Sequence, residues 1–76
     1  MSTDLTDLQQ RVLALVSKDS HRPSAITRVL VSRRFPCDQN QVNQALLELE
    51  KKGLVERFTA KTWVATSKGQ SEVQGT

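Results

Sequence analysis

One segment of the chain, residues 36–53 (PCDQNQVNQALLELEKKG), constrains the fold more than any other. It carries the start signal, the stop signal and the periodicity of a single amphipathic helix. Asp38 is suited to the N-cap, because a short carboxylate accepts the free N–H groups of the first helical turn. Lys51 and Lys52 suit the negative end of the helix dipole, and Gly53 can take the left-handed conformation that ends a helix. We therefore expect the fold to be built around this helix.

The two faces of the predicted helix differ in chemistry. Apolar residues recur at helical spacing on one face, which is expected to pack in the core. These residues are Val42, Ala45, Leu46 and Leu49. The opposite face is rich in amides and consists of Gln39, Asn40, Asn43, Gln44, Leu47 and Lys51. Because amides donate and accept hydrogen bonds and can pair bidentately with adenine, this face suits the reading of base edges. An ordinary solvated face is the alternative interpretation.

The composition indicates one small domain with a mildly basic charge. A chain of 76 residues with a hydrophobic content of 37% can bury only a thin core. There are 11 lysines and arginines against 8 aspartates and glutamates, a net charge of +3 that supports a nucleic-acid partner only weakly. The apolar runs are too short to span a bilayer, and the N-terminus lacks the apolar stretch of a signal peptide. We expect an intracellular protein that does not bind membranes.

Neither a catalytic motif nor a cofactor motif is recognisable in the sequence. Cys37 is the only cysteine and His21 the only histidine, which excludes an intramolecular disulfide and a standard structural zinc site. His21 is predicted to be a solvated residue of an exposed loop. Cys37 stands beside Asp38 at a helix start, where it is either a small turn residue or a redox switch. We expect no enzyme activity, no metal and no cofactor.

Two helices are predicted to precede the central one. Residues 4–18 carry apolar side chains at helical spacing, with Thr3 or Asp4 as the N-cap, and residues 1–3 should be frayed. A second helix is predicted over residues 23–31. Its β-branched residues are weak helix formers, so a strand is the alternative there.

The hydrophobic period changes from helical to alternating after Gly53. Residues 54–58 and 62–66 are rich in β-branched and aromatic side chains, and the three residues 59–61 separate them. This arrangement predicts an antiparallel hairpin that must pack on the helices, because an isolated hairpin is only marginally stable. Residues 67–76 are mostly serine, glycine, glutamine and charged residues, a composition that predicts a disordered tail.

The order helix, helix, turn, helix, hairpin resembles the winged helix-turn-helix domain, an α+β fold of three helices and a two-stranded wing. The resemblance covers residues 4–66 and is most specific over residues 42–55 (VNQALLELEKKGLV). It implies that the third helix enters the DNA major groove while the wing touches the flanking backbone. Base contacts are then expected from the amide face described above. The candidates for phosphate contacts are Lys51, Arg57 and Lys61, together with Arg28, Arg33 or Arg34.

A narrower resemblance connects the chain with Zα domains, winged helices that bind left-handed Z-form DNA and RNA. Asn43, Leu47 and Trp63 fall where that family carries an Asn, a Tyr and a Trp. The sequence departs from the family at Leu47, which has no ring, at Gln39, where a Lys is common, and in the hairpin loop, which lacks prolines. Trp63 is predicted to lie either in the core or beside the third helix.

These observations predict a small transcription regulator that binds double-stranded DNA as a monomer or weak homodimer. Binding of Z-form nucleic acid is one alternative. A protein-docking module is the other, because the predicted third helix has no lysine or arginine before Lys51 and begins next to Asp38.

Overall fold

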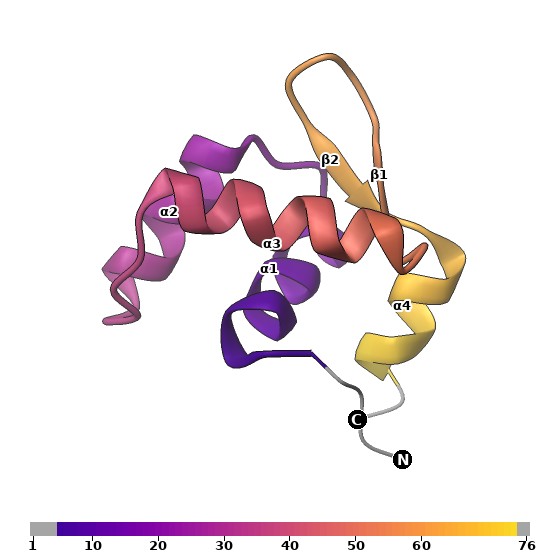
Figure 1. Ribbon diagram of the computed structural model, residues 1–76, viewed down its shortest axis with the longest axis horizontal. Helices are drawn as coiled ribbons and strands as arrows, with labels where there is room; N and C mark the ends of the chain where they lie inside the picture. The colour runs from indigo at the N-terminus through magenta and orange to yellow at the C-terminus, as the bar shows by residue number, and fades with distance from the viewer. Residues whose placement is uncertain (1–4, 75–76) are drawn as a thin grey trace.

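The computed structural model describes residues 5–74, which form four helices and a two-stranded antiparallel sheet (Figure 1). The elements in chain order are α1 (Asp7–Lys18), α2 (Pro23–Ser32), α3 (Gln39–Lys51), β1 (Val55–Arg57), β2 (Trp63–Ala65) and α4 (Ser67–Gln74). The predicted α+β winged helix-turn-helix fold is confirmed, with one more helix than expected. The predicted fraying of residues 1–3 lies outside the described residues. Within the described part, every helix is too short or too polar to cross a membrane.

α1 begins at Asp7, and its N-cap is Thr6, so the predicted start at Asp4 and the predicted cap at Thr3 or Asp4 are wrong. The reason is a capping box between Thr6 and Gln9. The Thr6 hydroxyl accepts a hydrogen bond from the Gln9 backbone N–H, and the Gln9 side chain accepts one from the Thr6 N–H, both at 3.1 Å. This reciprocal pair satisfies two N–H groups that the first helical turn otherwise leaves free.

α2 is a helix, so the alternative of a strand at this position is wrong. It ends in a Schellman motif, in which the Phe35 N–H donates to the Leu30 carbonyl oxygen at 2.9 Å and the Arg34 N–H donates to that of Val31 at 3.0 Å. The motif requires a left-handed residue, and Arg34 supplies it with a φ of 64°. An arginine thus occupies a position that glycine usually fills.

α3 has the predicted caps. The Asp38 carboxylate accepts a hydrogen bond from the Gln41 N–H at 2.8 Å, and the Gln41 side-chain oxygen accepts one from the Asp38 N–H at 3.0 Å. The helix ends at Lys51 with Lys52 as its C-cap, and the next residue, Gly53, has a φ of 76°. The Leu54 N–H then donates to the Leu49 carbonyl oxygen at 3.0 Å. Both ends of α3 are therefore specified by local sequence.

The hydrophobic core collects one face of each of the first three helices and the base of the hairpin. Its fully or nearly fully buried members are Val12, Leu13, Leu15, Val16, Ile26, Leu30, Val42, Ala45, Leu46, Leu49, Leu54, Val55, Trp63 and Ala65. The predicted apolar face of α3 is confirmed in full by this set. α3 packs on both α1 and α2, which fixes its rotation about its own axis.

The wing is shorter than predicted, because only three residues of each strand pair, with Arg57 opposite Trp63. A further bridge joins Trp63 to His21, through hydrogen bonds of 2.8 and 3.1 Å in the two directions. The loop contains no glycine. Instead, the Thr59 hydroxyl contacts the Thr62 hydroxyl at 2.7 Å and accepts from the Thr62 N–H at 3.1 Å, which closes the turn.

The disordered tail predicted over residues 67–76 is wrong for Ser67–Gln74, which form α4 beside α1 (Figure 1). Thr66 caps this helix, because its hydroxyl accepts from the Gly69 N–H at 3.1 Å. Gly69 is buried against the backbone of Leu54, and Val73 packs on the core. The composition of the segment resembles a disordered one, but a cap, a glycine at the contact and one apolar residue are enough to dock a short helix.

We predict that Gly69→Ala destabilises the protein. A Cβ atom at this position would overlap the Leu54 carbonyl oxygen, so α4 must shift or detach. We expect a net loss of about 1–2 kcal/mol in the free energy of unfolding, although alanine is the better helix former. Thermal and urea unfolding followed by circular dichroism measure the effect. Ser71→Ala, on the exposed side of α4, is the control and should not destabilise. Equal stability of both variants would show that α4 does not dock as described.

We predict the opposite sign for Arg34→Gly. Glycine adopts a positive φ without steric cost, so this change should raise the free energy of unfolding by about 0.5–1 kcal/mol. Arg33→Gly is the matched control, because Arg33 has a φ of −94° and gains nothing from glycine. Urea unfolding of the two variants beside the parent protein makes the comparison. A loss of stability in Arg34→Gly would show that the positive φ of Arg34 does not destabilise the parent protein.

Candidate nucleic-acid interface

A groove of about 520 Å³ lies between α3, the wing and the start of α2. It brings together most of the residues that the sequence predicts as contacts. The predicted residues that line it are Gln39, Asn43, Leu47, Arg57, Lys61 and Trp63. The remaining lining residues are Arg22, Pro23, Ser24 and Ala60.

α3 contributes one row of side chains to this groove. Gln39, Asn43 and Leu47 are spaced four residues apart, so they lie one above the other on the same side of the helix. Gln39 is exposed, Asn43 is half-buried, and Leu47 keeps 44% of its surface exposed. Within residues 5–74, the side-chain amides of Gln39 and Asn43 make no hydrogen bond. Both amides are therefore free to bond to a ligand in the groove.

The wing contributes a cation that is held in place by an aromatic ring. Arg57 and Trp63 are direct partners in the sheet register, so their side chains share one face of the hairpin. The Arg57 guanidinium carbon lies 5.0 Å from the centre of the Trp63 ring, within the range of a cation–π interaction. Trp63 is only 8% exposed. It is therefore a core residue that also lines the groove, which combines the two predicted placements.

The start of α2 is the part of the groove that the sequence analysis missed. Arg22 and Ser24 line it, and no side chain caps the helix at Arg22. The free N–H groups and the positive end of the α2 dipole are therefore near the groove. The backbone bridge between His21 and Trp63 brings this helix start to the wing. His21 is accordingly half-buried and bridged to β2, and the prediction of a solvated residue in an exposed loop is wrong.

The charges that line the groove are all positive. They come from Arg22, Arg57 and Lys61, and the described lining contains no acidic residue. Lys51 is exposed at the last position of α3 but does not line the groove. The candidate arginines in and after α2 are exposed and also lie outside the lining: Arg28, Arg33 and Arg34.

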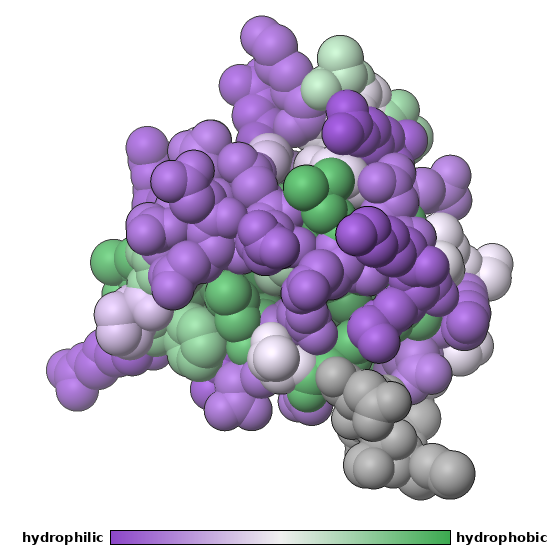
Figure 2. Space-filling model, viewed as in Figure 1, coloured by the Kyte–Doolittle hydropathy of each residue, from purple (hydrophilic) through white to green (hydrophobic). Residues whose placement is uncertain are grey.

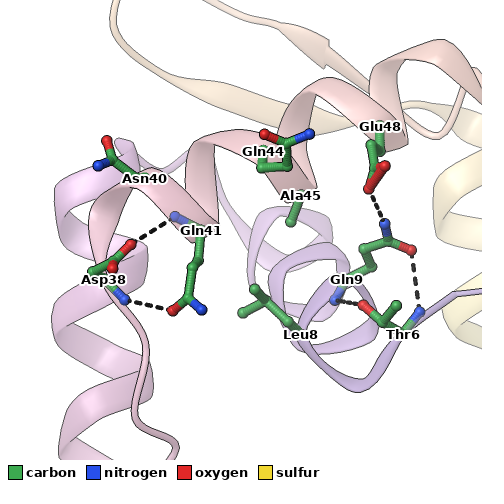
Figure 3. A pocket seen from close by; sticks show the side chains of 9 residues that line it. All are labelled: Thr6, Leu8, Gln9, Asp38, Asn40, Gln41, Gln44, Ala45 and Glu48. Atoms are coloured by element: carbon green, nitrogen blue, oxygen red, sulfur yellow. Dashed lines mark hydrogen bonds between the residues drawn. The ribbon is translucent and has the colours of Figure 1, made fainter.

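A second hollow, of about 360 Å³, lies on the other side of α3 against the start of α1 (Figure 3). It contains the two remaining amides of the predicted face, Asn40 and Gln44. Figure 3 shows the Gln9 side chain between Thr6 and Glu48, and its Nε2 donates to the Glu48 Oε2 at 2.7 Å. The charged residues of this hollow are the acidic Asp38 and Glu48. The predicted amide face is thus divided between a basic groove and an acidic hollow.

Cys37 has the surroundings of an unreactive thiol. Partial burial raises its pKa, and the negative charge of the adjacent Asp38 raises it further. Because the thiolate is the reactive form, both effects disfavour a redox role. The interpretation of Cys37 as a small turn residue fits these surroundings. Residues 5–74 also hold no group of three or more histidine, cysteine or acidic side chains placed to bind a metal ion.

No family model matches the chain, and no curated protein is significantly similar to it in sequence. Solved structures are similar in fold. RosR from H. salinarum superposes with a TM-score of 0.83 at 22% identity, over 99% of this chain and 73% of that one. Bacillus subtilis PadR in complex with operator DNA gives 0.78 at 18% identity, over 92% and 46%. A mutant of Lactococcus lactis ZitR gives 0.80 at 21% identity, over 97% and 51%.

These comparisons show the fold of the chain. The chain spans about half the length of the PadR and ZitR chains that it matches. The narrower resemblance to Zα domains is not supported by the comparisons. Asn43, Leu47 and Trp63 do line one groove of this structure. The chain has the winged helix-turn-helix fold, and it shares this fold with the PadR and RosR structures.

Proposed function

We propose that this domain binds double-stranded DNA and regulates transcription, with α3 in the major groove and the wing on the flanking backbone. The observation that carries the proposal is the groove beside α3. It combines unpaired amides from Gln39 and Asn43 with the cations Arg22, Arg57 and Lys61. An α-helix fits the major groove of B-form DNA, where amides read adenine, and cations placed at its sides meet the phosphates.

The arrangement answers the main argument against DNA binding. α3 has no lysine or arginine before Lys51, and from the sequence alone this shortage of cations favours protein docking. In the folded domain, Arg22 reaches the same groove from α2, and Arg57 and Lys61 reach it from the wing. The cations therefore lie in the groove beside α3 without belonging to that helix.

The structural neighbours support the proposal. PadR, which shares the fold, has been solved with operator DNA. An operator is a DNA site at which transcription is controlled, so a similar role for this domain places it inside the cell. A single domain with few phosphate contacts should bind weakly as a monomer, and a weak homodimer would strengthen binding by joining two half-sites.

We predict a salt-dependent affinity for duplex DNA. Three or four phosphate contacts, from Arg22, Arg57, Lys61 and Lys51, give a slope of about −3 to −4 in a plot of log K against log salt concentration. Fluorescence anisotropy with a labelled duplex across a salt series measures it. A complex that does not respond to salt would contradict this mode of binding and would favour protein docking.

The variant that tests this assignment is Arg57→Ala with Lys61→Ala. Removing two phosphate contacts should make the slope shallower by about 2. Lys18→Ala is the matched control, because Lys18 is exposed on α1 and lines a different hollow, so the slope should not change. Equal slopes for both variants would mean that the wing does not contact the backbone.

We predict that Asn43→Ala separates DNA reading from folding. Alanine is the better helix former, so the free energy of unfolding should stay equal or rise by a few tenths of a kcal/mol. Binding to duplexes selected from a random pool should weaken by about 1–3 kcal/mol if the amide bonds to a base edge. Asn40→Ala is the control, because Asn40 is an amide of the same helix that lies in the acidic hollow. This variant should lose less binding affinity than Asn43→Ala.

The form of DNA affected decides between the alternatives. If Asn43→Ala loses affinity for the selected B-form duplexes but not for unrelated ones, the result would support direct reading in the major groove. Inversion of the circular dichroism of a CG repeat by the parent protein would instead support a Z-form binder. Unchanged affinity for every duplex would contradict the role of Asn43.

A further inference from the structure

We infer that Leu47 reads the methyl group of thymine, so that the groove beside α3 selects A·T pairs; the inference rests on the proposed DNA binding. Leu47 is the one apolar residue of α3 that the core does not use. It is 44% exposed, whereas the apolar residues of the opposite face are buried: Val42, Ala45, Leu46 and Leu49. The hydrophobic core therefore does not account for a leucine at this position.

The surroundings of Leu47 are those of a reading surface. Asn43, one helical turn before Leu47, has a side-chain amide without a hydrogen bond in the described part of the chain, and Arg57 and Lys61 of the wing line the same groove. Figure 2 shows a small hydrophobic patch over the middle of α3, below the wing, with hydrophilic surface on most sides. Leu47 keeps 44% of its surface exposed, so the wing does not cover this side chain. An apolar group is thus held among groups that suit base edges and phosphates.

Base edges in the major groove offer one apolar group, the C5-methyl of thymine. Four residues of an α-helix span about 6 Å, and successive base pairs are about 3.4 Å apart. Asn43 and Leu47 should therefore reach bases within one or two pairs of each other. An amide suits adenine, and the methyl of thymine lies on the same groove edge of an A·T pair. The two side chains together recognise both members of A·T pairs.

The test uses replacement of thymine by deoxyuridine, which removes only the methyl group. Duplexes are selected from a random pool with the parent protein, and each thymine is then replaced in turn. We expect one or two positions at which affinity falls about fourfold, the factor that corresponds to burying one methyl-sized group. Leu47→Ala should bind the thymine and uracil duplexes equally well. Because Leu47 lies outside the hydrophobic core and alanine is the better helix former, this variant should unfold close to the parent temperature.

Val31→Ala is the matched control. Val31 is 52% exposed on α2 and does not line the groove, so this variant should discriminate thymine from uracil as the parent does. Tolerance of uracil at every position by the parent protein would overturn the inference while leaving DNA binding intact. Discrimination that survives in Leu47→Ala would assign the methyl contact to another side chain and would also overturn it. Failure to recover any duplex from the pool would instead overturn the proposed function.

Discussion

The burial of one face of α3 is the contact on which the rest of the molecule depends. Val42, Leu46 and Leu49 have no exposed surface, and they join the side chains of α1 and α2 in a single core. A helix has only one rotation about its axis that buries such a face, because its residues recur every 3.6 positions. Packing therefore decides which side chains point away from the core. The row of Gln39, Asn43 and Leu47 lies beside the wing as a consequence of burial on the other side.

The second constraint is the backbone pairing that joins the wing to the start of α2. Trp63 accepts from and donates to the backbone of His21, while its ring packs in the core and carries the Arg57 guanidinium. One residue thus connects the wing to the start of α2, two parts of the chain that are distant in sequence. This connection places Arg22 and Arg57 in the same groove beside α3, and it explains why the groove is basic although α3 itself has no cation in its groove row.

Much of this structure follows from local signals, and the parts that do not follow depend on long-range contacts. The ends of α3 are predictable because Asp38 and Gly53 are a cap and a stop in the sequence itself. The groove residues of α3 are predictable from periodicity. Arg22 is not, because only the bridge at His21 brings it to the groove. α4 is missed because its composition alone resembles disorder, whereas the helix is capped by Thr66 and packs closely at Gly69 against Leu54.

In the proposed function, the groove divides affinity and selectivity between different elements. Its cations lie next to α2 and on the wing, and charge acts over a distance of about 8–10 Å at physiological salt, so these groups would attract DNA before any base is contacted. The row on α3 is uncharged, and hydrogen bonds and methyl contacts act only at contact distance. An uncharged reading row adds little to binding at a wrong sequence, because it contributes only when base edges match it. The shortage of cations on α3, which first argued against a DNA reader, thus becomes the feature that would let this domain distinguish one sequence from another.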